Sequence, residues 1–255
     1  MGTGAVYIVG GDHAAADAKS RLFASVGLDA HIFHSPLEFL HGFAPEMPCC
    51  LVLEMRMPQM TGLELLSRMR RLPARAPAII VTAYGEVASA VRAMKLGAAE
   101  FLEKPVNDEQ LLEYVQHWIG VNRIERDNIR KCAAVREKLA RLSPREREVL
   151  SGVLDGRPNK EMARDLGIGP KTIELHRAKL MDKMEVSSVA ALIREALFCH
   201  RQQNTPVSCG ACHASAIPPR RGPERCGVMQ NPLAPASMAE RVAPEAQMIT
   251  ETCIK

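Results

Sequence analysis

The first 120 residues alternate between short apolar runs and stretches with helical spacing, and this alternation restricts the fold more than any other feature. Each apolar run is followed by a segment whose apolar residues recur every three or four positions. Such an order predicts an α/β fold, a doubly wound sheet of five parallel strands. The predicted strands are Ala5–Val9, Ala30–Phe33, Cys49–Leu53, Ala78–Thr82 and Glu100–Leu102.

A doubly wound sheet gathers its functional residues at the carboxyl ends of its strands. In this chain those ends carry one carboxylate, one hydroxyl, one ammonium group and two residues without a side chain. They are Glu54, Thr82, Lys104, Gly10 and Gly11. We expect a candidate site at this edge, while Cys49 and Cys50 fall within a buried strand and are expected in the core.

Residues 142–200 have a different pattern, that of a small all-α domain. Ser143 and Pro144 open a helix as N-cap and first helical residue. Further on, two helices over 160–166 and 171–184 are separated by a Gly-Ile-Gly turn and Pro170. Two helices joined by a short turn of this kind predict a helix-turn-helix unit.

The segment 121–141 contains no proline or glycine and is rich in charge, so it is predicted to be a helical linker. Its apolar residues Ile124, Ile129, Val135 and Leu139 form an imperfect stripe. Two interpretations stay open: a solvated helix, or a rotor or dimer contact.

The charge is distributed unevenly along the chain. Residues 1–120 hold 10 lysines and arginines against 13 acidic residues, whereas residues 121–201 hold 18 against 12. A basic middle favours a polyanionic partner. No apolar run approaches the ~18 residues of a membrane span, and no secretory signal precedes the first strand, so a cytoplasmic protein without a membrane partner is expected.

The helix over 171–184 is predicted to enter the DNA major groove, with Lys171, Glu174, Arg177, Ala178 and Met181 on its outer face. Arg177 and Lys171 suit guanine, and Glu174 suits cytosine. A second set of residues is expected to hold phosphates without reading sequence. This set is Lys160, Thr172, Lys179 and Lys183.

The stretch LSPREREVL…GRPNKEMARDLGIGPKTIELHRAKLMDKMEV resembles the LuxR-type DNA-binding domain of NarL/FixJ response regulators. This resemblance implies a four-helix domain that binds promoter DNA, as a homodimer and together with RNA polymerase. A departure is Gly169, where the family commonly has a serine cap; glycine is weaker there by a few tenths of a kcal/mol.

The motifs LEMRMPQMTGLELL, VTAYGEV and FLEKP make residues 1–120 similar to a FixJ-type receiver domain. The resemblance implies an acceptor aspartate, an acidic pair that holds Mg²⁺, and a hydroxyl and a lysine that grip the phosphoryl group. Glu54 replaces the acceptor, and Gly10 and Gly11 replace the pair. Thr82 and Lys104 are retained, as is an aromatic switch residue, Phe101.

Mg²⁺ requires near-octahedral oxygen ligation, and phosphoryl transfer relies on the charge it neutralises. Asp12, one residue beyond the usual pair, is a poor replacement for two carboxylates. We therefore expect no enzymatic activity, no cofactor and no aspartyl phosphorylation, which argues against a cognate histidine kinase. Glu54 is expected near Lys104 and Thr82, where it either mimics a phosphoryl group or only neutralises the lysine.

Residues 201–255 contain seven of the 17 prolines and no aromatic residue, and are expected to be disordered. The motif Cys209–His213 matches haem attachment by spacing, but lacks a haem pocket. Zinc is a better candidate, held by Cys209, Cys212 and His213 with Cys226 or Cys199, and Cys209 and Cys212 also suit redox chemistry. A dispensable tail without metal is the leading interpretation.

Three functions therefore compete. One is a DNA-binding transcription regulator that works without phosphorylation, with a redox- or zinc-responsive regulator as a variant of it. Another is a conventional phosphorylation switch. A third is a protein-interaction module that has lost DNA binding.

Overall fold

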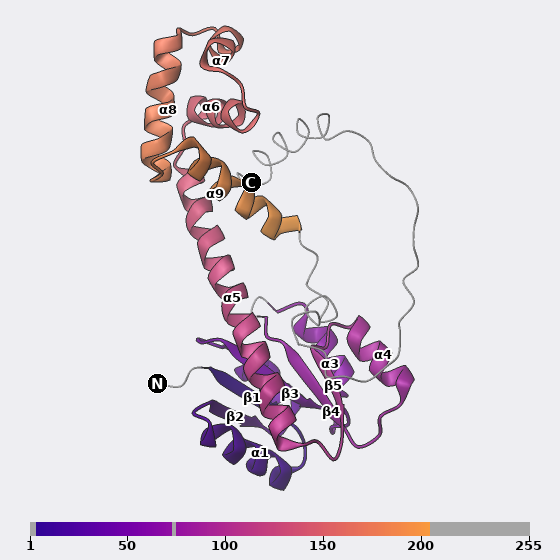
Figure 1. Ribbon diagram of the computed structural model, residues 1–255. Helices are drawn as coiled ribbons and strands as arrows, with labels where there is room; N and C mark the ends of the chain where they lie inside the picture. Colours follow the sequence, from indigo (N-terminus) through magenta and orange to yellow (C-terminus); the bar gives the residue numbers. More distant parts are fainter. Residues whose placement is uncertain (1–3, 73–74, 205–255) are drawn as a thin grey trace, which may run out of the picture. The chain divides into compact units, whose positions relative to one another are not determined.

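The computed structural model describes residues 4–72 and 75–204 (Figure 1). Five parallel strands form one sheet in the order β2-β1-β3-β4-β5, as the alternating pattern predicts. The strands are β1 (Ala5–Val9), β2 (Asp29–Phe33), β3 (Cys49–Glu54), β4 (Ala78–Thr82) and β5 (Glu100–Glu103). Residues 201–204, which were expected to be disordered, are helical instead. The expected disorder of residues 205–255 and the candidate metal ligands from Cys209 onward lie outside the described residues.

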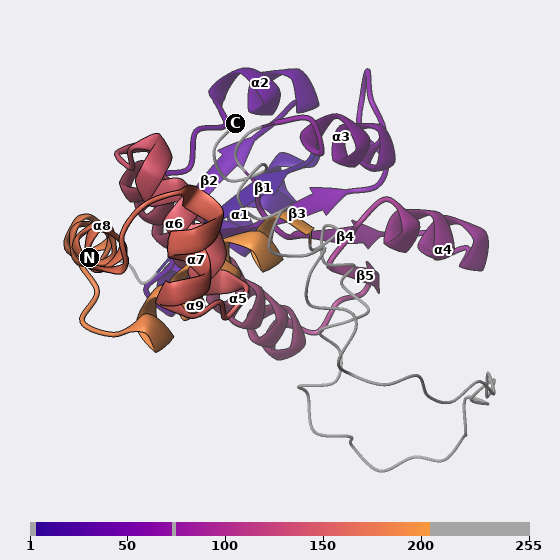
Figure 2. The same ribbon diagram turned by 90° about the horizontal axis from the view of Figure 1, so that it is seen from above.

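Helices cover both faces of the sheet, because β1, β3 and β4 are apolar on both sides. On one face lie α2 (Pro36–Gly42), α3 (Gly62–Met69) and α4 (Val87–Lys95). The other face packs against α1 (His13–Ser25) and the first part of α5 (Asp108–Ala140). The view of Figure 2 shows α2 and α3 together on one side of the sheet.

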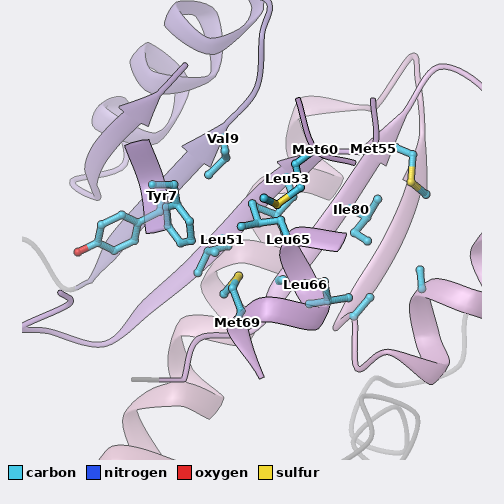
Figure 3. Packing of buried hydrophobic residues seen from close by; sticks show 14 of the residues in the cluster. Tyr7, Val9, Leu51, Leu53, Met55, Met60, Leu65, Leu66, Met69 and Ile80 are labelled. Atoms are coloured by element: carbon cyan, nitrogen blue, oxygen red, sulfur yellow. The ribbon is translucent and has the colours of Figure 1, made fainter. Parts of the chain in front are cut away.

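Figure 3 shows the first of these two cores, in which strand residues interlock with α3. Leu51, Leu53 and Ile80 project from the sheet onto Leu65 and Leu66, and all five side chains are buried. Thr61 fixes the start of α3 by a capping box with Glu64. Cys49 and Cys50 lie fully buried within β3, as expected.

The register of the strands aligns their carboxyl ends. Val9 pairs with Leu53, Glu54 with Val81, and Thr82 with Glu103. The residues that follow these pairs therefore meet at one edge of the sheet, where the sequence predicts the candidate site.

Helix α5 is continuous through the segment that was expected to be a separate linker. The described residues form two compact units that divide between Asp127 and Asn128, so α5 contributes to both. In the first unit the Asn122 side chain, 1% exposed, accepts a hydrogen bond from Cys49 N and donates one to Arg75 O.

The residues of the predicted apolar stripe thus differ in their exposure to solvent. Ile124 and Ile129 are exposed, whereas Val135 and Leu139 are buried in the core of the second unit. The end of α5 is therefore a structural part of the second unit, and a wholly solvated helix is ruled out for that end.

The second unit is all-helical, as predicted. After α5 come α6 (Pro144–Leu154), α7 (Asn159–Leu166), α8 (Pro170–Met184) and α9 (Val189–Asn204). Their shared core is apolar and includes Leu150, Ile173, Leu180 and Leu192. Among the described residues, no helix combines the length and apolar character that a membrane crossing needs.

Candidate functional site

An ion pair lies at the edge where the carboxyl ends of the strands meet. Lys104 Nζ donates a hydrogen bond to Glu54 Oε1 at 2.6 Å. The two side chains are 30% and 24% exposed, so solvent screens the pair only in part. Glu54 comes from the end of β3, and Lys104 follows β5 with its backbone nitrogen bonded to Thr82 O. The pair expected from the sequence is present.

Gly10 makes room for the carboxylate of Glu54. A Cβ atom placed on Gly10 would lie 3.1 Å from Glu54 Oε2, closer than an ordinary van der Waals contact. The longer glutamate side chain fits at the end of β3 because Gly10, directly after β1, has no side chain. Gly11 lies against Pro58 instead, with its notional Cβ 3.2 Å from Pro58 Cδ.

The Thr82 hydroxyl, unlike the Thr82 carbonyl, is not hydrogen-bonded to Lys104 or to Glu54 among the described residues, and its bonds are local. Thr82 Oγ1 accepts a hydrogen bond from Tyr84 N at 3.1 Å and donates one to Tyr84 O at 3.3 Å. Tyr84 is 62% exposed, and the Arg56 guanidinium stacks on its ring. Phe101 is half-buried against the core of the first unit. The expected grouping of Glu54 with both Lys104 and Thr82 is therefore met only for Lys104.

A small cavity of about 20 Å³, enough for one water molecule, adjoins the ion pair. Its lining includes Gly10, Asp12, Lys19, Glu54 and Lys104. The Asp12 side chain caps α1 by accepting a hydrogen bond from Ala15 N at 3.1 Å. Lys19 was not singled out from the sequence, because a lysine in a surface helix usually points into solvent.

This cavity does not fit Mg²⁺. One Glu54 oxygen is taken by Lys104, the Asp12 carboxylate caps a helix, and Gly10 and Gly11 supply no oxygen from a side chain. Two ammonium groups, Lys19 and Lys104, line the same space. Octahedral oxygen ligation at 2.0–2.1 Å, which Mg²⁺ prefers, has no donor set here.

The second unit builds a helix-turn-helix from local sequence signals. Ser143 forms a capping box with Glu146 at the start of α6. α7 ends at Gly167, whose positive φ of 66° favours glycine, and α8 begins at Pro170 directly after Gly169. The turn between α7 and α8 therefore spans three residues, as predicted.

The exposed face of α8 differs in part from the predicted reading face. Lys171, Glu174 and Ala178 are exposed, as expected. Met181 is partly buried against the core, and Leu175, which is outside the predicted reading face, is 53% exposed. Leu175 lies one turn from both Lys171 and Lys179, and a large apolar residue between two exposed lysines is the signal that could have identified it.

Two basic side chains of α8 are held by partners within the unit. Arg177 Nη1 donates to Asn159 Oδ1 at 2.5 Å, so the first residue of α7 binds α8. Lys183 Nζ donates to the buried carboxylate of Glu146 at 2.7 Å and to Arg141 O at 3.2 Å. The other predicted phosphate-contacting residues are exposed; they are Lys160, Thr172 and Lys179.

Comparisons with known proteins agree with both units. Residues 6–116 match the response regulator receiver domain, and residues 140–196 match the bacterial regulatory proteins of the luxR family. The transcriptional regulatory protein FixJ of Bradyrhizobium diazoefficiens is 37% identical over 194 residues, which are 76% of this chain and 95% of that protein. The response regulator protein TodT of Pseudomonas putida is 35% identical over 74% of this chain and 83% of its own length.

A solved structure is also similar. The response regulator StyR matches with a TM-score of 0.70 at 33% identity, over 76% of this chain and 98% of that one. A receiver joined to a LuxR-type helix-turn-helix defines a DNA-binding response regulator, a class of transcription factors and not of enzymes. The chain belongs to the FixJ-type response regulators of two-component systems.

Proposed function

We propose that this response regulator controls transcription without phosphorylation of its receiver. The observation that carries the proposal is the Glu54–Lys104 ion pair. The position of the expected acceptor aspartate is occupied by a glutamate, and its carboxylate is already bonded to Lys104. Gly10 and Gly11 supply no carboxylate for Mg²⁺, on which the charge neutralisation of phosphoryl transfer depends.

Glu54 acts as a neutralising partner of Lys104 and not as a mimic of a phosphoryl group. A mimic would engage the hydroxyl as well as the lysine, because both grip the phosphoryl group in receivers of this type. The Thr82 hydroxyl is bonded to Tyr84 on both its donor and acceptor sides, which favours neutralisation.

Incubation with acetyl phosphate and Mg²⁺, followed by intact-mass measurement, tests the proposal directly. We expect no added phosphoryl group on the full chain, with a phosphorylatable FixJ-type regulator as the positive control. A stoichiometric adduct that is lost in Glu54→Ala would overturn the proposal and support a conventional switch.

Promoter binding tests the role of Glu54. DNA fragments from upstream of the chain's own gene and of its genome-mapped sites serve as probes in a gel shift. We expect the DNA affinities of Glu54→Ala and Glu54→Asp to lie within about twofold of that of the native chain. A glutamate that only neutralises Lys104 has no role in DNA binding. A tenfold or greater loss in both variants would instead support the mimic.

We further propose that the chain binds promoter DNA as a homodimer and contacts RNA polymerase there. Paired half-sites about one helical turn apart suit two copies of one helix-turn-helix. Footprinting measures the half-site spacing, and sedimentation of the chain with and without DNA measures the number of copies bound.

A further inference from the structure

Lys19 lies on the face of α1 that is turned toward the candidate site. Asp12, Ala16 and Lys19 follow one another at helical steps of four and three residues, and each lines the cavity beside the ion pair. Ala15 and Ala16 carry only methyl groups, so they leave space beneath α1 into which the long side chain of Lys19 extends. Lys19 is half-buried there.

The electrostatic surroundings of Lys19 agree with this placement. Burial lowers the pKa of the Lys19 ammonium, and the neighbouring charge of Lys104 lowers the pKa further. The carboxylates of Glu54 and Asp12 act in the opposite direction. The charges of Lys104, Glu54 and Asp12, which line the cavity, therefore also act on the pKa of Lys19.

Two ammonium groups and two carboxylates thus face this cavity: Lys19 and Lys104, Glu54 and Asp12. The space is balanced in charge without a metal ion. A divalent cation that entered would meet two positive charges at short range in a partly desolvated site, where charge repulsion is stronger than in water.

We propose that Lys19 is a built-in cation of the receiver, which occupies the electrostatic place of a divalent metal ion, shares with Lys104 the neutralisation of Glu54, and excludes Mg²⁺. This inference rests on the proposed function, since it explains how the charge of Glu54 is balanced without a metal ion or a phosphoryl group. Lys19 acts as a positioning residue that stabilises Glu54, not as a catalytic one.

Restoring the lost carboxylates tests exclusion. The full chain carrying Gly10→Asp, Gly11→Asp and Glu54→Asp is prepared with Lys19 and, separately, with Lys19→Met, which keeps most of the aliphatic stem but not the charge. Calorimetric titration with Mg²⁺ measures the affinity of each. We expect at least tenfold tighter binding when Lys19 is replaced. Equal affinities in the two proteins would overturn the proposal.

A second measurement uses the native pocket, in case the restored proteins do not fold. Lys19→Met, Glu54→Gln and the double variant are unfolded thermally at low and high salt. Burial and the charge of Lys104 offset the attraction between Lys19 and Glu54, so Lys19→Met alone is not expected to lower the Tm. We expect Glu54→Gln to lower the Tm by a few degrees more in the native chain than in Lys19→Met, and we expect this difference to shrink at high salt. Equal losses in the two backgrounds would contradict the role of the charge.

These outcomes are separable from those of the proposed function. A phosphoryl adduct on the native chain would refute phosphorylation-independent control and would leave the metal affinities of the restored proteins unaffected. Conversely, equal Mg²⁺ affinities with and without Lys19 would refute only the built-in cation.

Discussion

Leu175 is an apolar side chain that α8 holds in solvent between two lysines. Its exposed fraction of 53% contrasts with Ile173 and Leu180 of the same helix, which are fully buried. Apolar side chains on a recognition helix contact the methyl group of thymine in the major groove. At the residue scale, we therefore expect Leu175 to contribute to sequence reading beside Lys171 and Glu174.

Replacing Leu175 with alanine should weaken binding to promoter DNA by about tenfold, in line with ~1–3 kcal/mol for the loss of one matched base pair. Fluorescence anisotropy with thymine-containing and uracil-containing probes measures the effect. If Leu175 reads a methyl group, uracil should weaken the native chain but not Leu175→Ala. Ile124→Ala, which also removes an exposed apolar side chain, serves as the matched control and should bind as the native chain does.

At the element scale, two lysine side chains join the C-terminal ends of α5 and α8. Lys183 near the end of α8 donates to Arg141 O just after α5, while Lys138 near the end of α5 donates to Met184 O at the end of α8. Lysines near helix C-termini satisfy carbonyl groups that lack partners within the helix and favour the negative end of the helix dipole. The recognition helix is thereby held to the last turn of α5.

Lys183→Met should destabilise the second unit by about 3 kcal/mol, because it leaves the Glu146 carboxylate buried without its charged partner. Glu146→Gln should cost less, since Lys183 is 36% exposed and retains water. Thermal unfolding followed by circular dichroism checks the order of the two variants. A loss in Lys183→Met no greater than that of the exposed Lys179→Met would contradict a structural role for the pair.

The same pair makes the stability of this unit depend on pH. Burial alone would raise the pKa of Glu146, but hydrogen bonds from Lys183 and Ser143 outweigh it and lower the pKa below its ordinary 4.5. A carboxyl group whose folded pKa is depressed stabilises the fold fully above its unfolded pKa and loses that contribution as pH falls through the folded value. Urea unfolding between pH 6 and 3 should show the loss beginning near pH 4.5 in the native chain and reduced in Glu146→Gln.

Most elements could be predicted from the sequence, because apolar periodicity and capping residues such as Ser143 act locally. The continuity of α5 could not. Glycine disfavours helix interiors, and Gly120 separates the two helices that the sequence predicts. The helix continues because packing on both sides of this point, at Ile119 and at the buried amide of Asn122, outweighs the propensity of one residue.

The candidate site was predictable in part for the same reason. Glu54 and Lys104 could be placed together, since the carboxyl ends of parallel strands meet. Other features depend on tertiary contacts that no local pattern encodes. They are the direction of the Thr82 hydroxyl, the position of Lys19 at the cavity and the pairing of Lys183 with Glu146. The sequence therefore predicts the Glu54–Lys104 pair at the sheet edge but not the partners of the other side chains.

At the scale of the whole molecule, the boundary between the two units lies within a helix and not in a loop. The match to the luxR family begins at residue 140, yet the core of the second unit also includes Cys132, Val135 and Leu139 of α5. Cys199 of α9 lies fully buried in the same core, and its thiol donates to Cys132 O at 3.5 Å.

A fragment that starts at residue 128 should therefore be more stable than one that starts at residue 142, although both contain the helix-turn-helix. Leu139→Ala in the longer fragment should cost about 2–5 kcal/mol, the range for truncating a buried leucine. Urea unfolding of the three proteins measures both effects, with Ile129→Ala on the exposed side of α5 as the control. Equal stability of the two fragments would place the boundary after α5.

The close approach of Gly10 to Glu54 has a consequence for how the two positions can vary. An aspartate introduced at position 10 alone would push into the Glu54 carboxylate and disturb its bond to Lys104. Glu54→Asp alone would shorten the acidic side chain and leave position 10 without a carboxylate. Neither single substitution builds a metal site, and each weakens the present ion pair. The residues at positions 10 and 54 thus constrain each other, and the side chain that one position tolerates depends on whether the other has been changed first.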